Sequence, residues 1–183
     1  EHDKSLPARY ARAIAAHRDG DTDLALKRLD ILLGDFPNDV FFVELKGQIY
    51  LEAGQPVAAE QAYRQAVGLA RTAGLPAATV AALELDLGRA LLSGNQTAGD
   101  HAAVTTLTPL ARFLGDDPLY WRQLAIARGR TGDDALAALA LAEAAIRRYQ
   151  LADAQRFAQR AVRQLKTGSP AWLRANDIAA QVA

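Results

Sequence analysis

The feature that most constrains the fold is a repeat of 34 residues at the beginning of the chain. Two copies keep the order small, small, large, apolar. The matched pairs are Ala13 with Gly47, Ala25 with Ala59, Leu29 with Tyr63, and Leu32 with Ala66. Gly20 and Gly54 have the same spacing and stand where a left-handed residue can end a helix. The small positions let paired helices approach closely, and the large one fills the groove between successive pairs.

This period and residue pattern is the tetratricopeptide signature, a stack of two-helix hairpins. Composition agrees, since 50% of the residues are hydrophobic and only 7% are aromatic. Ala and Leu dominate the apolar residues, and both are strong helix formers. The sequence therefore predicts an all-α fold of tandem hairpins, stacked as a right-handed superhelix (an α-solenoid) of about ten helices. The alternative is an alanine-rich helical bundle whose matches are coincidental.

The repeat becomes irregular after its second copy, because Gly88 follows Gly47 by 41 residues rather than 34. We expect a single repeat domain over 1–183, with units near 6–39, 40–75, 76–117 and 118–148 and a degenerate last unit over 134–183. Residues 94–100 are expected to lengthen the turn inside the third hairpin. Proline signals and periodicity predict helices at 6–18, 22–34, 39–53, 56–71, 76–93, 101–114, 118–131, 134–148, 151–166 and 169–181. Pro109 should kink or restart the sixth of these helices.

Charge and residue types argue against several function classes. Lys plus Arg equals Asp plus Glu at 21 each, so a nucleic acid partner is not indicated. The longest apolar stretches, such as 135–142, are too short to span a membrane. The chain lacks cysteine, and its histidines (His2, His17 and His101) do not have zinc-ligand spacing. The acidic stretches 19–21 and 116–118 suit turns and helix N-caps. We therefore expect no catalytic residue, no metal and no cofactor in this chain.

The repeat frame predicts which side chains line a binding groove, because the first helices of such hairpins form the concave face. The predicted groove residues are Tyr10, Ile14, His17, Glu44, Gln48, Leu51, Arg89, Leu92, Arg122, Ile126 and Arg130. This mixture of apolar and charged side chains suits an extended peptide or a helix. The alternative for each residue is that it is only solvated or packs on a neighbouring hairpin.

Five blocks, in order, resemble the C-terminal repeat region of bacterial M48-type zinc metallopeptidases. The blocks are 3–15, 42–49, 121–127, 137–140 and 168–178. This family, which includes the periplasmic beta-barrel assembly-enhancing protease, joins a His-Glu-x-x-His peptidase domain to a C-terminal tetratricopeptide domain. The peptidase domain is absent from this chain, so the resemblance implies that zinc is bound only in a domain upstream.

The same resemblance implies a role and a location. It predicts a non-catalytic module that positions substrates or gates a protease in outer-membrane protein quality control. The implied partners are its own peptidase domain, envelope proteins and unfolded outer-membrane proteins. The implied location is the periplasm, with any export signal upstream of Glu1. The main alternative is a free-standing tetratricopeptide adaptor with unrelated partners, and an independent enzyme is a third.

Overall fold

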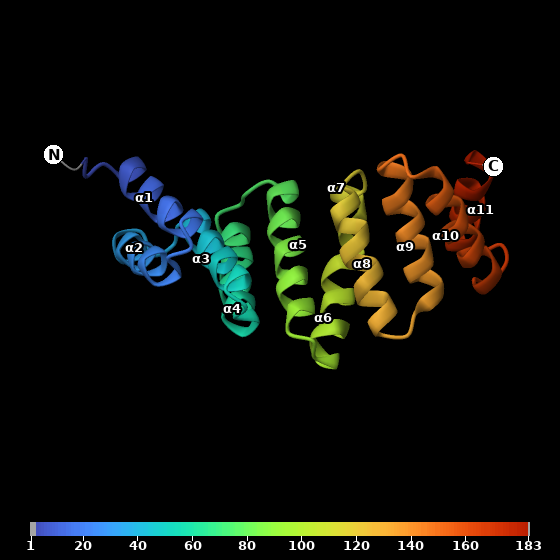
Figure 1. The fold of residues 1–183 in the computed structure, drawn as a ribbon, viewed down its shortest axis with the longest axis horizontal. Helices are drawn as coiled ribbons and strands as arrows, with labels where there is room; N and C mark the ends of the chain where they lie inside the picture. The colour runs from blue at the N-terminus through green and yellow to red at the C-terminus, as the bar shows by residue number, and fades with distance from the viewer. Residues whose placement is uncertain (1–2, 183) are drawn as a thin grey trace. The chain divides into compact units, whose positions relative to one another are not determined.

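The computed structural model describes residues 3–182, and within them every regular element is helical (Figure 1). The ten expected helices are all found there, and the sixth is divided into three short pieces. The elements are α1 (Leu6–Arg18), α2 (Thr22–Asp35), α3 (Val40–Glu52), α4 (Pro56–Thr72), α5 (Ala77–Ser93), α6 (Thr97–Leu107), the 3₁₀-helix η1 (Thr108–Leu110), α7 (Ala111–Leu114), α8 (Pro118–Arg130), α9 (Asp134–Arg147), α10 (Leu151–Gln164) and α11 (Pro170–Gln181).

The chain forms two compact units, Glu1–Ser93 and Gly94–Ala183. The boundary falls inside the expected third repeat, 76–117, between its two helices. Each unit is described by itself below, and the expectation of a single domain over 1–183 stays a prediction. None of the helices within residues 3–182 is both long and apolar enough to cross a membrane.

Short polar side chains fix where several helices begin. The carboxylate of Asp21 accepts a hydrogen bond from the Leu24 amide at 3.0 Å and caps α2. Asp117 caps α8 in the same way, through the Leu119 amide at 2.7 Å. Both residues belong to the acidic stretches expected to form turns and caps, so that prediction is confirmed. Such caps satisfy backbone donors that have no partner inside the helix.

The turns inside the hairpins need a left-handed residue. Gly20, Gly54 and Gly132 take it with φ of +81°, +71° and +83°. Tyr149 occupies the equivalent place before α10 with φ of +57°. A side chain with a β-carbon adopts this conformation at a penalty of about 1–2 kcal/mol. The turn before α10 is therefore strained where the three glycine turns are not.

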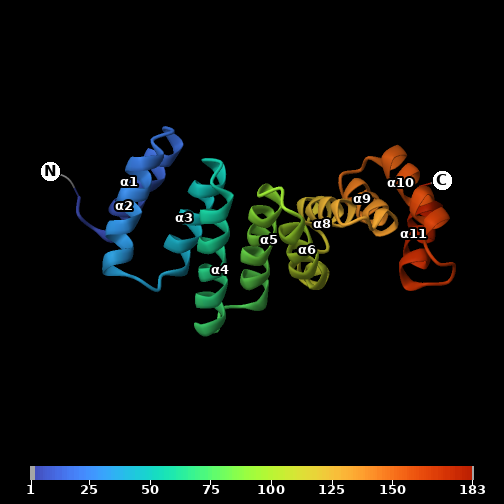
Figure 2. The same cartoon turned by 90° about the horizontal axis from the view of Figure 1, so that it is seen from below.

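Close packing in the first unit explains the 34-residue pattern. Ala13, Ala25 and Leu29 are fully buried, in a core between α1, α2 and α3. In the second copy, a β-carbon added to Gly47 would lie 3.1 Å from the ring of Tyr63. Glycine is thus favoured here, because an aromatic ring of α4 lies directly against the backbone of α3. Views in two directions show α4 beside both α3 and α5 (Figures 1 and 2).

Alanine fills most of the core of the second unit. Ala142, Ala145, Ala154 and Ala158 pack together around Ile178 of α11, so α9, α10 and α11 come close to one another. Small side chains suit such close approach of helices, and they leave little room for large cavities.

The sixth expected helix differs from the prediction at its start. It begins at Thr97 instead of near 101, so residues 94–100 do not form a long turn. Asn95 reverses the chain with φ of +49°, and the Asp100 amide already donates to the Gln96 carbonyl at 2.9 Å. The expected break at Pro109 is confirmed, since α6 ends at Leu107 and is followed by η1 and α7. Proline has no amide hydrogen to continue the α-helical bonding.

Candidate functional site

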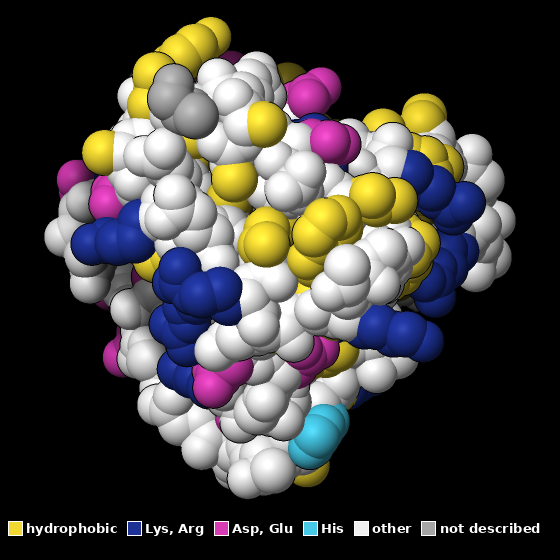
Figure 3. All heavy atoms as spheres, turned by 90° about the vertical axis from the view of Figure 1, so that its right-hand side faces the viewer, with side chains coloured by type: hydrophobic (Ala, Val, Ile, Leu, Met, Phe, Trp, Pro, Cys, Tyr) yellow, Lys and Arg dark blue, Asp and Glu magenta, His cyan; other side chains and the backbone are white. Residues whose placement is uncertain are grey.

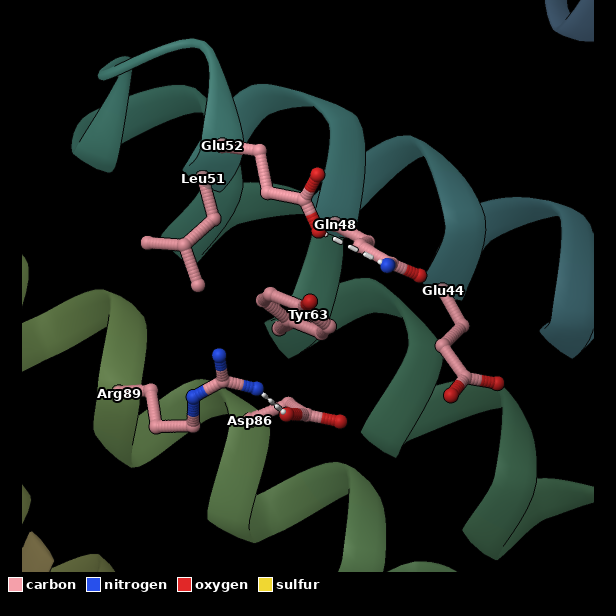
Figure 4. Close-up of a pocket in the computed structure, with 7 residues that line it drawn as sticks. All are labelled: Glu44, Gln48, Leu51, Glu52, Tyr63, Asp86 and Arg89. Carbon is pink, nitrogen blue, oxygen red and sulfur yellow. Dashed lines mark hydrogen bonds and ion pairs between the residues drawn. The ribbon is translucent and has the colours of Figure 1, made fainter. Parts of the chain in front are cut away.

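An open polar pocket lies in the first unit between α3 and α5, with α4 beneath it (Figure 4). Its volume is near 160 Å³. The lining residues are Glu44, Gln48, Leu51, Glu52, Tyr63, Asp86 and Arg89. Four of them, Glu44, Gln48, Leu51 and Arg89, were predicted as groove residues from the repeat frame, and the fold brings these four together.

Helical spacing places the walls of the pocket. Glu44, Gln48 and Glu52 are four residues apart along α3, so they share one face of that helix. Asp86 and Arg89 are three apart on α5 and face them across the pocket (Figure 4).

Tyr63 of α4 forms the floor and is only 2% exposed. Its ring is held against Gly47, which fixes the position of the phenol below the two walls.

Two polar contacts order the walls. The Arg89 guanidinium donates to the Asp86 carboxylate at 2.7 Å. On α3, the Gln48 amide donates to Glu52 Oε1 at 2.9 Å. The other oxygen of Glu52 lies 3.1 Å from Nε2 of His17, a predicted groove residue of α1. These contacts hold Glu52 and Asp86 in place, so two of the acidic groups are preorganised.

Glu44 differs from the other acidic groups. Within residues 3–182 its carboxylate makes no ion pair or hydrogen bond. Burial raises the pKa of Glu44, and the nearby Asp86 carboxylate raises it further. Burial also raises the pKa of Asp86, against the hydrogen bond and charge of Arg89. The pocket therefore contains more carboxylates than positively charged groups that could pair with them.

Other predicted groove residues of the first unit lie elsewhere. Tyr10 stands with its ring centre 5.1 Å from that of Phe42, beside an apolar pocket of about 490 Å³. Ile14 packs against the core of α1, α2 and α3. Leu92 is only 4% exposed, so its placement on a free surface was wrong. The repeat frame gives Leu92 the same position as Leu51, four residues after the small residue, but it does not show how deeply a side chain is buried.

In the second unit, the predicted residues Arg122, Ile126 and Arg130 lie on one face of α8 and are exposed. Ile126 is 38% exposed, and Arg130 lies 3.2 Å from the carboxylate of Asp100 on α6. Next to this face, the Trp121 indole donates to the Gly115 carbonyl at 2.7 Å. The face thus carries two arginines, one of them paired with Asp100, with an apolar residue between them.

A buried carboxylate on α9 was not predicted. Glu143 is 3% exposed and accepts two hydrogen bonds from Arg174 of α11, at 2.6 and 2.9 Å. Arg147 also donates to it. Burial alone would raise the pKa of Glu143, but the two guanidinium groups outweigh burial and hold it below the usual range. The Glu143 carboxylate is thus paired with both guanidinium groups, which is the pattern of a structural ion-pair group.

Apolar side chains are exposed around the start of α10. Tyr149 is 88% and Leu151 52% exposed, beside a shallow pocket of about 520 Å³ that Ile146 and Val182 also line. Seen from the side of α10 and α11, hydrophobic side chains gather between groups of Lys and Arg side chains (Figure 3). Neither Tyr149 nor Leu151 was among the predicted groove residues.

The side chains at these sites are of the kinds that form ion pairs, hydrogen bonds and apolar contacts. No group of three or more His, Asp or Glu side chains within residues 3–182 has the arrangement of a metal site. His101 is exposed, and His2 lies outside the described residues. The α3–α5 pocket offers carboxylates, a guanidinium, an amide and a phenol. These groups provide charge and hydrogen bonds for a ligand.

The fold and the surface define a class: a tandem helical-hairpin protein of the tetratricopeptide-like type. Three solved structures share this fold. One is a crystal structure of MamA, with 18% identity, a TM-score of 0.66, and cover of 93% of this chain and 91% of that one. The MamA RS-1 ArsTM double mutant has 21% identity, a TM-score of 0.68, and cover of 81% and 79%. A further MamA crystal structure has 17% identity, a TM-score of 0.68, and cover of 95% and 84%.

The comparisons correct the expectation drawn from the sequence blocks. No family model matches the chain, and no curated protein matches it. The structural neighbours are MamA proteins rather than domains of M48 peptidases. The resemblance to the metallopeptidase family is therefore wrong, and the protease-related partners lose their basis with it. The blocks coincide because tetratricopeptide-like hairpins repeat small and large residues at common positions. The periplasmic location stays a prediction.

Proposed function

We propose that this chain is a non-catalytic protein-binding module that works as a free-standing adaptor. The observation that carries the proposal is the convergence of Glu44, Gln48, Leu51 and Arg89 on one open pocket. Stacked hairpins present first-helix side chains to extended segments of other proteins, which suits such a surface. The structural likeness to MamA proteins supports the fold on which this proposal depends.

The dimensions of the pocket favour a polypeptide over a small-molecule cofactor. Sites for cofactors and drug-sized ligands are usually 300–1,000 Å³ and mostly apolar. The α3–α5 pocket has about 160 Å³ and mainly polar walls. Such a pocket accommodates one side chain, while the rest of a bound segment runs over the neighbouring surface.

Site-specific photo-crosslinking tests this proposal. A photoreactive residue replaces Gln48 in the pocket, Arg122 on α8, or Gln65 on α4 as a matched control. All three positions are exposed, and Gln65 lies outside the pocket. We expect Gln48 to give defined crosslinks to a protein partner in extracts of the source cells, and Gln65 to give none.

Arg122 shows whether the α8 face contacts the same partner. Equal crosslinking at Gln48 and Gln65, or none at either Gln48 or Arg122, would refute the proposed binding surface. Partner binding that survives replacement of both Arg122 and Ile126 by alanine would remove the α8 face from it.

A further inference from the structure

We propose that the α3–α5 pocket is a recognition site for one lysine or arginine side chain of the bound polypeptide. This inference rests on the proposed protein-binding function and names the chemistry of the partner. It follows from the charge of the pocket, from the hydroxyl of a largely buried tyrosine that has no partner within residues 3–182, and from the size of the space.

The charge of the pocket is acidic although the whole chain has a formal net charge of zero. Three carboxylates, those of Glu44, Glu52 and Asp86, face the single guanidinium of Arg89. That guanidinium is already engaged with Asp86 at 2.7 Å. Glu44 has no ionic partner within residues 3–182, and a ligand cation placed beside it would supply one. Removal of a charge from water is favourable only when such a partner is present.

Tyr63 provides an independent indication of a ligand. Its side chain is 2% exposed, and the close-up places it between the α3 and α5 walls (Figure 4). Its hydroxyl has no hydrogen-bond partner within the part of the chain that the structure describes. The hydroxyl is not sealed from the pocket, so a ligand group that enters can reach it. The phenol oxygen can accept a hydrogen bond from an ammonium or guanidinium group that enters the pocket.

The size of the space fits one long side chain. Its volume of about 160 Å³ is close to the ~150 Å³ of an engineered cavity that binds benzene. Leu51 offers an apolar contact for the methylene stem of lysine or arginine, and the carboxylates surround the charged end. Long basic side chains commonly bury their stem in this way and keep the charged head among polar groups.

An acidic ligand group is disfavoured in the same position. A carboxylate would meet Glu44 and Glu52, and the only positive group of the pocket is bound to Asp86. Like charges placed together in an interface weaken binding strongly. The pocket therefore selects for basic and against acidic residues of the partner.

Peptide display on the full chain tests the inference. A random peptide library is selected on the wild-type chain, and the dissociation constants of the enriched peptides are measured by fluorescence anisotropy. We expect a lysine or arginine at one fixed position of these peptides. Replacing that residue by glutamine in the peptide should weaken binding at least about tenfold, which is the effect of losing a hydrogen bond to a charged group.

Three variants of the chain connect the effect to the pocket. Glu44→Gln should weaken binding of the basic peptides about tenfold, and it should fold normally because Glu44 has no ion pair to lose. Tyr63→Phe keeps the ring on Gly47 and removes only the hydroxyl, so a smaller loss is expected. Glu60→Gln is the matched control, since Glu60 pairs with Arg64 on α4 outside the pocket. The control should bind like the wild type.

The outcomes separate this inference from the proposed function. Enriched peptides without a basic residue, or basic peptides that bind Glu44→Gln and wild type equally, would overturn the recognition site and leave protein binding intact. Enrichment of acidic peptides that depend on Arg89 would reverse the charge assignment. Failure to enrich any peptide over an unrelated helical control protein would overturn both proposals.

Discussion

Replacing Gly47 by alanine tests whether the contact between α3 and the Tyr63 ring limits the residue at this position. The new β-carbon would lie 3.1 Å from ring atoms of Tyr63, whereas carbon atoms prefer about 3.5–4.0 Å. The ring or the helix must move by a few tenths of an ångström. Overpacking of this kind destabilises by about 1–3 kcal/mol.

An opposite effect comes from the backbone. Alanine in the middle of a helix is more favourable than glycine by about 0.5–1 kcal/mol. For Gly47 the two effects oppose each other, and the net expectation is a loss of about 1 kcal/mol. Gly68 in the interior of α4 is the matched control, because nothing lies within 4 Å of a β-carbon added there. Gly68→Ala should therefore stabilise the chain by about 0.5–1 kcal/mol.

Urea unfolding followed by far-ultraviolet circular dichroism measures both changes. The two variants should differ by about 2 kcal/mol, with the midpoint of Gly47→Ala below that of the wild type and the midpoint of Gly68→Ala above it. Tryptophan fluorescence alone is unsuitable, because Trp121 and Trp172 both lie in the second unit. If both variants stabilised the chain equally, the close contact with Tyr63 would not constrain position 47, and the reasoning would be refuted.

Three further predictions concern the second unit, where tryptophan fluorescence during urea unfolding reports stability. Glu143→Gln should lose about 3 kcal/mol, because it leaves the two guanidinium groups without a buried counter-charge. The pKa of Glu143 is held below its usual range, so its stabilisation is present above the ordinary glutamate pKa and is lost as the pH falls through the lower folded value. The variant should lack that acid-dependent loss, and an unchanged pH profile would contradict the assignment. Tyr149→Gly should gain about 1 kcal/mol by removing left-handed strain, because a side chain that is 88% exposed has little packing to lose, and an unchanged or lower midpoint would contradict this. Ser169→Ala should lose about 1 kcal/mol, since Ser169 caps α11 through the Trp172 amide, and an unchanged midpoint would show that this cap contributes nothing.

Most of the helices could be predicted because their signals are local. Proline, N-cap residues and glycine act within a few residues of the helix end, so the start of α8 at Pro118 was expected correctly. The start of α6 was missed because Asn95, rather than glycine, supplies the left-handed residue of the turn. A polar stretch containing two glycines resembles a loop, although Thr97 already begins the helix.

The candidate site was predictable in part, because the repeat period shows which side of each helix faces the groove. The repeat frame gives the facing side of a helix, which identified Glu44, Gln48, Leu51 and Arg89. It does not show how deeply a side chain is buried, so the burial of Leu92 was not foreseen. That Tyr63, expected to pack between hairpins, also forms the floor of the pocket was not foreseen either.

Specific polar contacts between distant residues, such as the ion pair of Glu143, were not predictable. Glu143 and Arg174 are 31 residues apart, and neither has a local feature that indicates the other.

The ion-pair group of Glu143 also limits how hairpins can be exchanged in the second unit. Arg174 comes from α11, whereas Glu143 comes from α9, two helices earlier. A graft or deletion that removed α11 would expose the alanines that pack around Ile178. It would also remove Arg174, one of the two guanidinium partners of the buried Glu143 carboxylate. Helices α9 to α11 therefore form one structural unit. A chimaeric array must either transfer all three helices or carry an arginine at the position of Arg174.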